Sequence, residues 1–551
     1  MIGNLQQTRY GVYIYCKFIS IQSVISELSK MIATLLPITL FLIAYSLYLF
    51  TRRKFSYWEK KNIPHLPPTT IFGNYSSFML LKENLGESTR KLCAKFPNAP
   101  LIGAYYGTEP SLIVQDPELI KLITTKDFHI FNGREVSEHT HKEMLTRNLF
   151  FTYGDRWKAL RQNLSPIFSS SKMKSMFSLI GKCSFVFEDM LDREIGSSSV
   201  IDVRTILARF TMDCICTCAF GVDAQTMVKT ENNVFKHMGD VIMDASSTAA
   251  LKNIFRAIWP SIFYGSGFRV FSKDIDNFFS KLLTNIFETR NYQPSNRNDF
   301  IDFMLKMKKN NLVGDSLKNS NPETVSKVTV EIDDEFLVAN CVLFFVAGYD
   351  TSSTELSFTL FELAKNPEKQ AKVIEEVDAY LRRHDNKLEY ECVAEVPYLE
   401  ACVDEAMRLY PVLGVVSREA QENYMFPSGL TIEKGMRVHI PLYRLHTNPD
   451  FFPDPLEYRP ERFYGEEKRN IKPYTYMPFG EGPRTCLGMR FARMQMAAGL
   501  ITIFKKYRVE LAPGMKTHLD FNPTSLITAS TKDIRLKFIE REGWQTRLLA
   551  K

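Results

Sequence analysis

The sequence predicts a mainly α-helical protein with a small β-sheet subdomain, preceded by one membrane-spanning helix. Residues 332–366 form an apolar-rich run without proline, which predicts a single buried helix about 50 Å long. Residues 160–330 alternate helical patterns with polar breaks, whereas residues 99–116 and 424–442 carry short apolar runs typical of strands. Residues 31–50 contain no charged side chain, which indicates a bilayer-spanning segment.

Composition excludes several classes of protein. The chain has 551 residues, a formal net charge of +7 and 45% hydrophobic residues, which is enough for one large core or two domains. No long basic run alternates with aromatic residues, so a nucleic-acid partner is not expected. The ten cysteines lack paired spacing, so no disulfide scaffold is predicted and most of the chain is expected to face the cytosol. Cys214, Cys216 and Cys218 precede a glycine in a helical pattern, which favours buried helix cysteines over a zinc site.

The amino-terminal part of the chain divides into segments. Residues 1–30 form an atypical extension, residues 31–50 the membrane anchor and residues 51–68 a basic, proline-rich linker to the domain at 69–551. Basic residues follow the anchor directly, so the remainder is expected on the cytoplasmic side. No small-residue cleavage site is evident, so a retained anchor is expected, with a buried core helix as the alternative. We also hypothesise that Met31 is the functional start, which native peptides from residues 1–30 would refute.

A helix near residue 157 brings an aromatic and a cationic side chain together. Trp157 and Arg161 are four residues apart, so they project from one helix face. An arginine in this position can bind a buried carboxylate through two hydrogen bonds. Taken alone the pair is weak evidence, since an arginine on the surface of a core helix is the common case. No G-x-G-x-x-G sequence follows a strand, so no nicotinamide or flavin site is expected in this chain.

The long helix at 332–366 carries an unusual polar stretch at its middle, from Ala347 to Ser352. Gly348 costs about 1 kcal/mol relative to alanine in a helix, and its missing side chain lets a flat ligand approach. Thr351 can donate a hydrogen bond back to a helix carbonyl and loosen the helix. With Asp350 beside it, the stretch can supply protons to a ligand. The alternative is a kinked helix whose polar patch packs against another element.

The most specific signal is the run from Phe479 to Gly488, F-G-E-G-P-R-T-C-L-G. Cys486 stands just before a predicted helix, where exposed N–H groups and the helix dipole favour a thiolate. The glycines permit a tight turn and a close approach of the backbone to a ligand of the sulfur. Arg484 can meet an anionic group nearby. The alternative is a buried, redox-inert cysteine in a turn.

Two further motifs concern structure. Glu405 and Arg408 share a helix face at i, i+3, and Arg462 lies in a P-E-R-F sequence downstream. A solvated surface pair is the commoner reading of Glu405 and Arg408 taken alone. Arg418 follows in a predicted strand region, and packing or a hydrogen bond, rather than metal binding, is expected of His446.

These motifs, in this order, resemble those of the cytochrome P-450 family: W-x-x-x-R, A-G-x-D-T-S, E-x-x-R, P-E-R-F and F-G-x-G-x-R-x-C-x-G. The resemblance covers about residues 60–540. In detail the sequence is most similar to the microsomal, insect-type branch of the drug- and toxin-oxidising clan. It implies a mostly helical, triangular fold with a small sheet domain, so that residues 69–551 form a haem-binding monooxygenase domain. The cofactor implied is haem b.

The family's functional residues map onto this sequence by motif. The resemblance implies Cys486 as the axial iron ligand; Trp157, Arg161, Arg418 and Arg484 as partners of the haem propionates; Phe479 in the ligand loop; Ala347 and Gly348 at a dioxygen groove; and Asp350 and Thr351 as the proton relay. Glu405, Arg408 and Arg462 are implied to lock together and hold the cysteine loop. The resemblance implies that a thiolate ligand on the iron favours cleavage of the O–O bond of bound dioxygen.

The implied activity is that of an unspecific monooxygenase in the endoplasmic reticulum membrane. It inserts one atom of dioxygen into apolar small molecules, either xenobiotics or endogenous lipids. Electrons come from NADPH-cytochrome P-450 reductase, with cytochrome b5 as a further candidate partner. Lys158, Arg490 and Arg493 are candidates for contact with the reductase's acidic surface. The sequence does not identify the substrate.

Two alternatives remain at this point. One is a haem-thiolate isomerase that rearranges peroxides without a reductase, and the other is a non-enzymatic haem sensor. An isomerase usually lacks the acid–alcohol pair, so Asp350 and Thr351 count against it. An intact proton relay beside a long apolar helix counts against a sensor.

Overall fold

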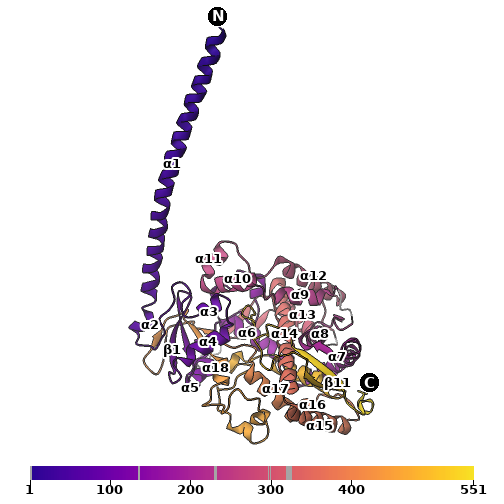
Figure 1. The fold of residues 1–551 in the computed structure, drawn as a ribbon. Helices are drawn as coiled ribbons and strands as arrows, with labels where there is room; N and C mark the ends of the chain where they lie inside the picture. The colour runs from indigo at the N-terminus through magenta and orange to yellow at the C-terminus, as the bar shows by residue number, and fades with distance from the viewer. Residues whose placement is uncertain are drawn as a thin grey trace.

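The computed structural model describes residues 3–134, 137–228, 232–295, 297, 299–317 and 326–550. A long helix, α1 (Gly3–Lys54), stands out from a globular part that contains all other elements (Figure 1). Strands are short and few beside the helices, so the prediction of a mainly α-helical chain with small β-sheets is confirmed.

The other α-helices are α2 (Tyr57–Lys60), α3 (Ser76–Met79), α4 (Leu85–Ala94), α5 (Pro117–Lys121), α6 (Gly154–Leu164), α7 (Ser170–Ser197), α8 (Val203–Ile215), α9 (Val234–Ile242), α10 (Ser247–Ile258), α11 (Pro260–Gly265), α12 (Lys273–Thr289), α13 (Phe300–Asn310), α14 (Asp334–Lys365), α15 (Pro367–Arg383), α16 (Cys392–Glu395), α17 (Pro397–Leu409), α18 (Leu442–His446) and α19 (Met489–Phe504). The strands are β1 (Leu101–Tyr106), β2 (Glu109–Val114), β3 (Val200–Asp202), β4 (Leu312–Asp315), β5 (Lys327–Val330), β6 (Val416–Glu419), β7 (Tyr424–Met425), β8 (Thr431–Ile432), β9 (Arg437–Ile440), β10 (Tyr507–Leu511) and β11 (Arg535–Glu540).

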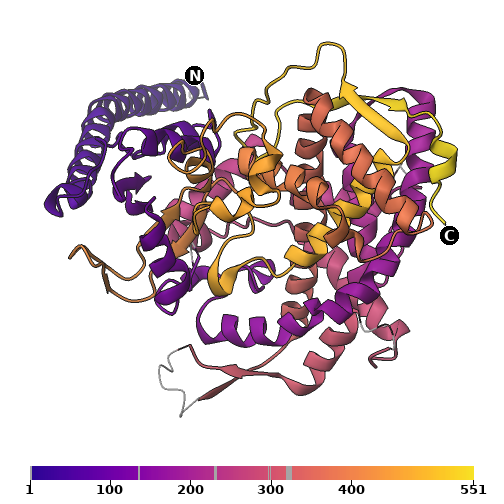
Figure 2. The same cartoon turned by 90° about the horizontal axis from the view of Figure 1, so that it is seen from below.

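The largest sheet has four strands in the order β1-β2-β9-β6. β1 and β2 form an antiparallel hairpin, β9 joins β2 in parallel, and β6 pairs antiparallel with β9, so that Arg418 lies opposite Val438. A second sheet has the order β10-β11-β3, and β4–β5 and β7–β8 are separate hairpins. Figure 2 shows the β4–β5 hairpin beside α6, which it contacts along its length. The strands predicted at 99–116 and 424–442 are therefore confirmed.

Helix α14 runs through the middle of the helical part (Figure 1). The Asp333 side chain caps its first turn by accepting a hydrogen bond of 2.8 Å from the Phe336 N–H, and Pro367 follows its end, as predicted. Its 32 residues correspond to about 48 Å. It packs against α8, α12, α17 and α19, so its middle is buried on several sides.

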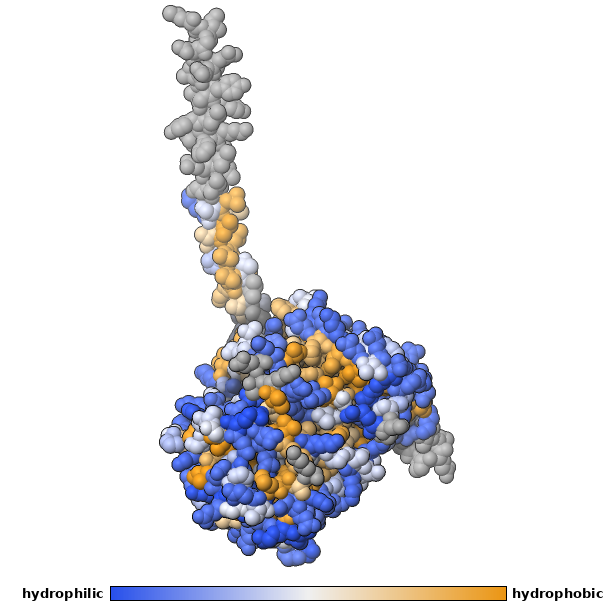
Figure 3. Space-filling model, turned by 90° about the vertical axis from the view of Figure 1, so that its right-hand side faces the viewer, coloured by the Kyte–Doolittle hydropathy of each residue, from blue (hydrophilic) through white to orange (hydrophobic). Residues whose placement is uncertain are grey.

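The amino-terminal helix is joined closely to the four-stranded sheet. Its apolar side chains form the orange band above the globular part in Figure 3, and residues 27–60 and α14 are both long and apolar enough to cross a membrane. α14 is mostly buried in the protein, whereas the window in residues 27–60 is not buried at all. The segment expected as a linker, 51–68, packs on the sheet: Trp58 is fully buried and its Nε1–H donates to the Ala104 carbonyl at 2.8 Å.

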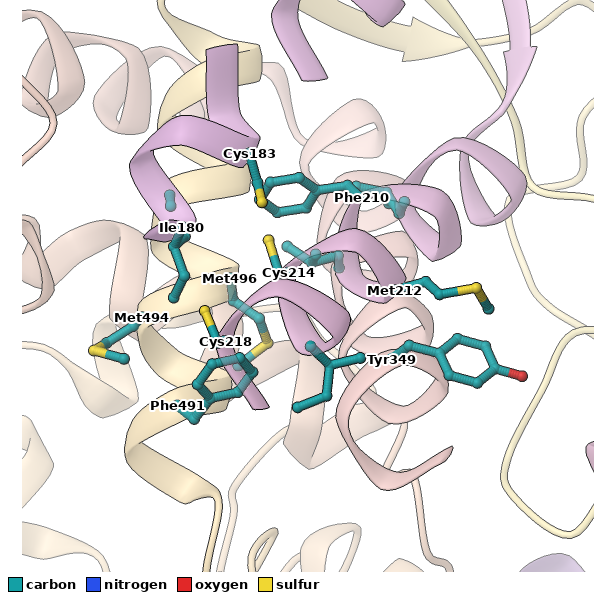
Figure 4. Close-up of a cluster of buried hydrophobic side chains, with 14 of the residues drawn as sticks. Ile180, Cys183, Phe210, Met212, Cys214, Cys218, Tyr349, Phe491, Met494 and Met496 are labelled. Atoms are coloured by element: carbon teal, nitrogen blue, oxygen red, sulfur yellow. The ribbon is translucent and has the colours of Figure 1, made fainter. Parts of the chain in front are cut away.

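A sulfur-rich core lies where α7, α8, α14 and α19 meet. Figure 4 shows Cys183, Cys214 and Cys218 among the side chains of Phe210 and Met496. All three cysteines are buried, no disulfide joins the nine cysteines whose side chains are described, and no potential metal site of three or more His, Cys, Asp or Glu occurs in the described residues. The prediction of buried helix cysteines is confirmed. This core supports α19, whose first turn follows Cys486.

We expect Gly103→Ala to lower the free energy of unfolding by about 1–3 kcal/mol, as overpacking does in a filled core. A Cβ atom at Gly103 in β1 would lie 2.4 Å from the buried Trp58 ring. Gly181→Ala in α7 is the matched control, because a Cβ there meets no atom within 4 Å, and it should be neutral or stabilising. Urea denaturation of both variants measures the difference, and equal stabilities would contradict the proposed packing of Trp58.

Candidate functional site

A cavity of about 1120 Å³ is lined by residues of α14 and of the segment 479–488, which is called the cysteine loop below. All ten residues predicted for the site line it: Trp157, Arg161, Ala347, Gly348, Asp350, Thr351, Arg418, Phe479, Arg484 and Cys486. They come from α6, α14, β6 and the loop before α19, which are far apart in the sequence. Most of the remaining lining is apolar, including Leu149, Phe168, Ile215, Val342 and Val346. The fold thus brings one predicted set of residues to one enclosed space.

The cysteine loop has a backbone that its glycines make possible. Gly482 has a φ of +72°, and a Cβ atom there would lie 1.8 Å from the Thr124 carbonyl oxygen. The Cys486 N–H donates to the Phe479 carbonyl at 2.8 Å and closes the turn. α19 begins three residues after Cys486, at Met489. The helix-mouth position predicted for the sulfur is confirmed.

The electrostatic setting of Cys486 differs from the expectation. Its side chain is exposed, and the space it faces is the cavity. Burial within the protein raises the pKa of the thiol, while the Gly488 N–H, Arg161 and Arg134 act to lower it. Burial is the larger effect, so in the protein alone the helix terminus does not suffice to favour the thiolate. A cation bound to the sulfur would favour the thiolate.

The loop is held by a buried ion pair on α17. Arg408 donates to both carboxylate oxygens of Glu405 at 2.7 Å, neither side chain is exposed, and Arg462 Nε lies 3.4 Å from Glu405 Oε1. Arg408 Nη1 also donates to the His446 carbonyl at 2.8 Å. His446 Nε2 in turn accepts a hydrogen bond of 3.1 Å from the Met477 N–H, two residues before Phe479 of the loop. The implied lock is present, and the hydrogen-bonding role predicted for His446 is confirmed.

A second attachment lies closer to the sulfur. Arg493 on α19 forms ion pairs with Glu400 at 2.6 Å and Asp404 at 2.9 Å, both on α17. The Tyr476 hydroxyl donates to the Asp404 carbonyl at 2.9 Å. These contacts fix both ends of the cysteine loop to the same helix. No sequence motif indicated them, because partners 72 to 93 residues apart share no periodic spacing.

Several buried arginines converge on the cysteine side of the cavity. Arg484 donates to the carbonyl oxygens of Asn132 at 2.7 Å and Phe150 at 3.2 Å, and its guanidinium lies over the Trp157 ring at 4.7 Å. Arg418 is 1% exposed, its Nε has no partner among the described residues, and burial lowers its pKa to about 10.

Within the part of the chain that the structure describes, no carboxylate balances the charges of Arg161, Arg418 and Arg484. Among the described residues, none lies within ion-pair distance of Arg161, Arg418 or Arg484. Burial lowers the pKa of Arg484, and repulsion from Arg134, Arg418 and Arg161 lowers it further. Like charges that converge in a buried space are unfavourable unless an anion joins them. The arrangement therefore fits a ligand that carries carboxylates.

Sequence reasoning missed Arg134. Its guanidinium lies over the Phe150 ring at 3.7 Å, it lines the cavity, and its charge acts on both Cys486 and Arg484. It belongs to no recognisable motif.

The α14 side of the cavity presents a hydroxyl and a carboxyl. Thr351 Oγ1 donates to the Ala347 carbonyl at 2.8 Å, as predicted. Asp350 Oδ1 accepts a hydrogen bond of 3.0 Å from Arg204, whose side chain is 38% exposed. Burial raises the pKa of Asp350 and Arg204 partly offsets this. Arg204, on α8, was also missed, because it lies 146 residues away.

The reason for Gly348 requires a correction. A Cβ atom there would lie 2.6 Å from Ile215 Cγ1 on α8. The glycine therefore permits close packing of α8 against α14. In that direction Ile215, and not a flat ligand, leaves no room for a side chain. Gly348 still lines the cavity beside Ala347.

The residues present fit haem b. The Cys486 thiol is the available metal ligand, with an exposed sulfur side chain facing the cavity. Arg161, Arg418 and Arg484 supply the charge that two propionates would neutralise. Apolar residues form much of the remaining lining, as a macrocycle requires. Asp350 and Thr351 of α14 line the same cavity and are groups able to move protons.

Comparison with known proteins gives one consistent result. The family model described as Cytochrome P450 matches residues 64–538. The chain is 32% identical to Cytochrome P450 6B2 of Helicoverpa armigera over 507 residues, 92% of this chain and 98% of the relative. It is 33% identical to Cytochrome P450 6B1 of Papilio polyxenes over 498 residues, 90% and 97% of the two chains. Cytochrome P450 6k1 of Blattella germanica is 32% identical over 502 residues, 90% and 94%.

We expect the free energy of unfolding to fall as the pH is lowered from about 6.5 to about 3, because burial holds the pKa of His446 at about 3. The unfolded chain then binds a proton that the folded chain cannot accept, so stability is lost with acid. His446→Gln keeps an acceptor for the Met477 N–H and should flatten part of this slope. Denaturant titrations across the pH range measure the effect.

His384→Gln is the control. His384 pairs with Glu395 near the surface and its pKa is raised, so its loss should leave the acid slope in place. Equal slopes for the His446→Gln variant and the unsubstituted protein would contradict the neutral, buried state of His446. His439, whose pKa burial also lowers to about 3, contributes a parallel slope that remains in both variants.

Proposed function

Because the chain belongs to the cytochrome P450 family, we propose that it is a membrane-anchored haem-thiolate monooxygenase that inserts one atom of dioxygen into apolar small molecules such as xenobiotics. Members of this family bind haem through a cysteine thiolate to iron. The observation that carries the proposal is that Cys486, Asp350 and Thr351 line one and the same cavity. The neighbouring arginines, without carboxylate partners among the described residues, support it.

The chain holds the cofactor at three kinds of contact. Cys486 would supply a thiolate ligand, and Arg161, Arg418 and Arg484 would bind the propionates, with the Trp157 ring under the Arg484 guanidinium. When bound, haem supplies the activation of dioxygen. Arg161 and Arg134 act to lower the pKa of the Cys486 thiol and would favour the thiolate as a ligand. The Glu405–Arg408 pair keeps the loop in position for this ligation.

The α14 side positions and moves protons. The Thr351 hydroxyl donates to Ala347 in the structure, so it can hold a water molecule as acceptor and pass on its own proton. Asp350 is buried at its base but paired with Arg204, which reaches solvent. Because Asp350 also lines the cavity, its carboxyl group can exchange protons with water there. The pair favours a monooxygenase over a haem-thiolate isomerase or a non-enzymatic sensor.

The substrate occupies the apolar part of the same cavity. Leu149, Phe168, Val342 and Val346 provide contacts without hydrogen-bonding groups, which select by shape and hydrophobicity. Such a lining binds apolar xenobiotics or endogenous lipids and excludes bulk water from the reaction. The apolar lining is the observation that supports this substrate class.

Electrons are proposed to come from NADPH-cytochrome P-450 reductase, with cytochrome b5 as a second candidate partner. Of the three basic residues, Arg490 is exposed and donates a hydrogen bond to the Ser170 hydroxyl, its one polar side-chain contact among the described residues. Lys158 donates to the Ser316 carbonyl, and Arg493 is committed to its ion pairs on α17. Arg490 is therefore the best candidate for contact with an acidic partner. The exposed apolar window in residues 27–60 supports anchoring in the endoplasmic reticulum membrane with the catalytic domain in the cytoplasm.

A carbon monoxide difference spectrum of the reduced protein tests the proposal directly. We expect the red-shifted band of thiolate-ligated haem in the unsubstituted protein and its loss in Cys486→Ser. Cys402→Ser on α17 is the control, because this buried thiol does not line the cavity and the band should persist. An imidazole-type band in the unsubstituted protein would overturn the assignment.

We expect Arg490→Glu to raise several-fold the reductase concentration needed for half-maximal turnover, because it replaces an exposed positive charge near the cysteine loop. The effect should shrink at high salt, since exposed charges are screened. Arg493→Glu should instead lower the melting temperature, because it breaks two ion pairs within the protein. Unchanged reductase dependence in Arg490→Glu would exclude this contact.

A further inference from the structure

Glu355 stands on the cavity-facing stripe of α14 but belongs to none of the motifs described above. Ala347, Thr351 and Glu355 are spaced by four residues, so they lie along one face of the helix, and all three line the cavity. Met407 and Met496, from α17 and α19, line the same space. Glu355 therefore lies one turn beyond Thr351, toward the helices that hold the cysteine loop.

The carboxyl group of Glu355 is buried and lacks hydrogen-bond partners. The residue is 2% exposed, and neither Oε1 nor Oε2 has a partner among the described residues. Glu362, on the same helix and equally buried, contrasts with it: its Oε1 accepts a hydrogen bond of 2.8 Å from Lys365 and another from the Tyr410 hydroxyl. A structural role would need such partners, so Glu355 is not explained by packing.

The charges around Glu355 favour its neutral form. Asp404 on α17 is the nearby charge that acts on it, and Arg493 on α19 is already paired with Asp404 and Glu400. Tyr476, just before the cysteine loop, donates a hydrogen bond from its hydroxyl to the Asp404 carbonyl. On α14 itself, Asp350 is paired with Arg204. Burial and, to a lesser extent, Asp404 raise the pKa of Glu355 well above its ordinary value.

A neutral carboxylic acid is both a donor and an acceptor of hydrogen bonds. Buried polar atoms without protein partners are normally satisfied by ordered water, which needs a polar site with room beside it. Glu355 meets that condition because its side chain borders the cavity. Water between it and Thr351 would span one helical turn, about 5.4 Å along the axis.

We propose that Glu355 is a second proton-carrying residue of this site, which holds a proton as a neutral carboxylic acid and passes it through ordered water to Thr351. The O–H bond of the carboxyl group breaks as the adjacent water gains the proton. The Thr351 hydroxyl accepts a proton from that water and donates its own proton to the ligand in the cavity. The Glu355 carboxylate then regains a proton from solvent water. The proposal rests on the proposed monooxygenase function.

The first test is infrared spectroscopy of the haem-loaded protein at neutral pH. A buried, protonated carboxyl group gives a separate carbonyl band that shifts in heavy water. We expect this band in the unsubstituted protein, its loss in Glu355→Gln and its retention in the control Glu362→Gln, whose carboxyl group is hydrogen-bonded to Lys365 and Tyr410. Absence of the band, or its survival in Glu355→Gln, would overturn the proposal.

The second test is the pH dependence of unfolding. Because the folded pKa of Glu355 is raised, the folded chain binds a proton that the unfolded chain releases. This contribution to stability is present at acid pH and is lost as the pH rises through and above the ordinary glutamate range. Glu355→Gln should remove that loss, whereas Glu362→Gln should not. An unchanged slope in Glu355→Gln would contradict a protonated Glu355.

The third test separates proton transfer from structure. In Glu355→Gln and Glu355→Met we expect a several-fold drop in product formed per NADPH consumed, with the balance appearing as hydrogen peroxide. The carbon monoxide band should remain, and the melting temperature of Glu355→Met should not fall, because no hydrogen bond within the described residues is lost. Full coupling in both variants, or a marked loss of stability in Glu355→Met, would refute the proposal. A missing thiolate band in the unsubstituted protein would instead refute the proposed function.

Discussion

The buried ion pair between Glu405 and Arg408 connects the scaffold to the site. Burying both charges is costly, and only a complete set of hydrogen bonds offsets the cost. Arg408 reaches that set by donating to backbone carbonyls around His446, Pro455 and Glu457 as well as to its partner. The same bonds fold the long segment before α19 against α17. The hydrogen bonds that the buried Arg408 guanidinium requires therefore also position the cysteine loop.

The two sides of the cavity carry opposite kinds of polar group. Arg161, Arg418 and Arg484 line the cavity together with the thiol of Cys486, and acids and a hydroxyl lie along α14. This separation suits a planar ligand with carboxylates at its edge, a metal at its centre and proton chemistry on one face only. It also orients the ligand, because the reverse placement would bring carboxylates beside Asp350 and Glu355.

Helix α14 combines two demands that oppose each other. Its packing against α8, α12, α17 and α19 favours small and apolar residues, and Gly348 meets that demand at the contact with Ile215. Its cavity face nevertheless carries Asp350, Thr351 and Glu355, whose hydrogen-bond donors and acceptors are not all paired with other groups of the described residues. Polar groups in such a place lower stability, and function is the physical reason to keep them.

The sequence alone determined the elements and the predicted site. Apolar runs and proline positions predicted α14, the short strands and the uncharged anchor, because local periodicity reflects which face is buried. Short motifs identified ten site residues, since chemistry requires particular side chains at particular spacings. Only the tertiary structure decided how those residues are held and balanced. Arg134, Arg204, the Arg493–Asp404 pair and Glu355 depend on partners or burial contributed by distant segments, and no local pattern encodes such contacts.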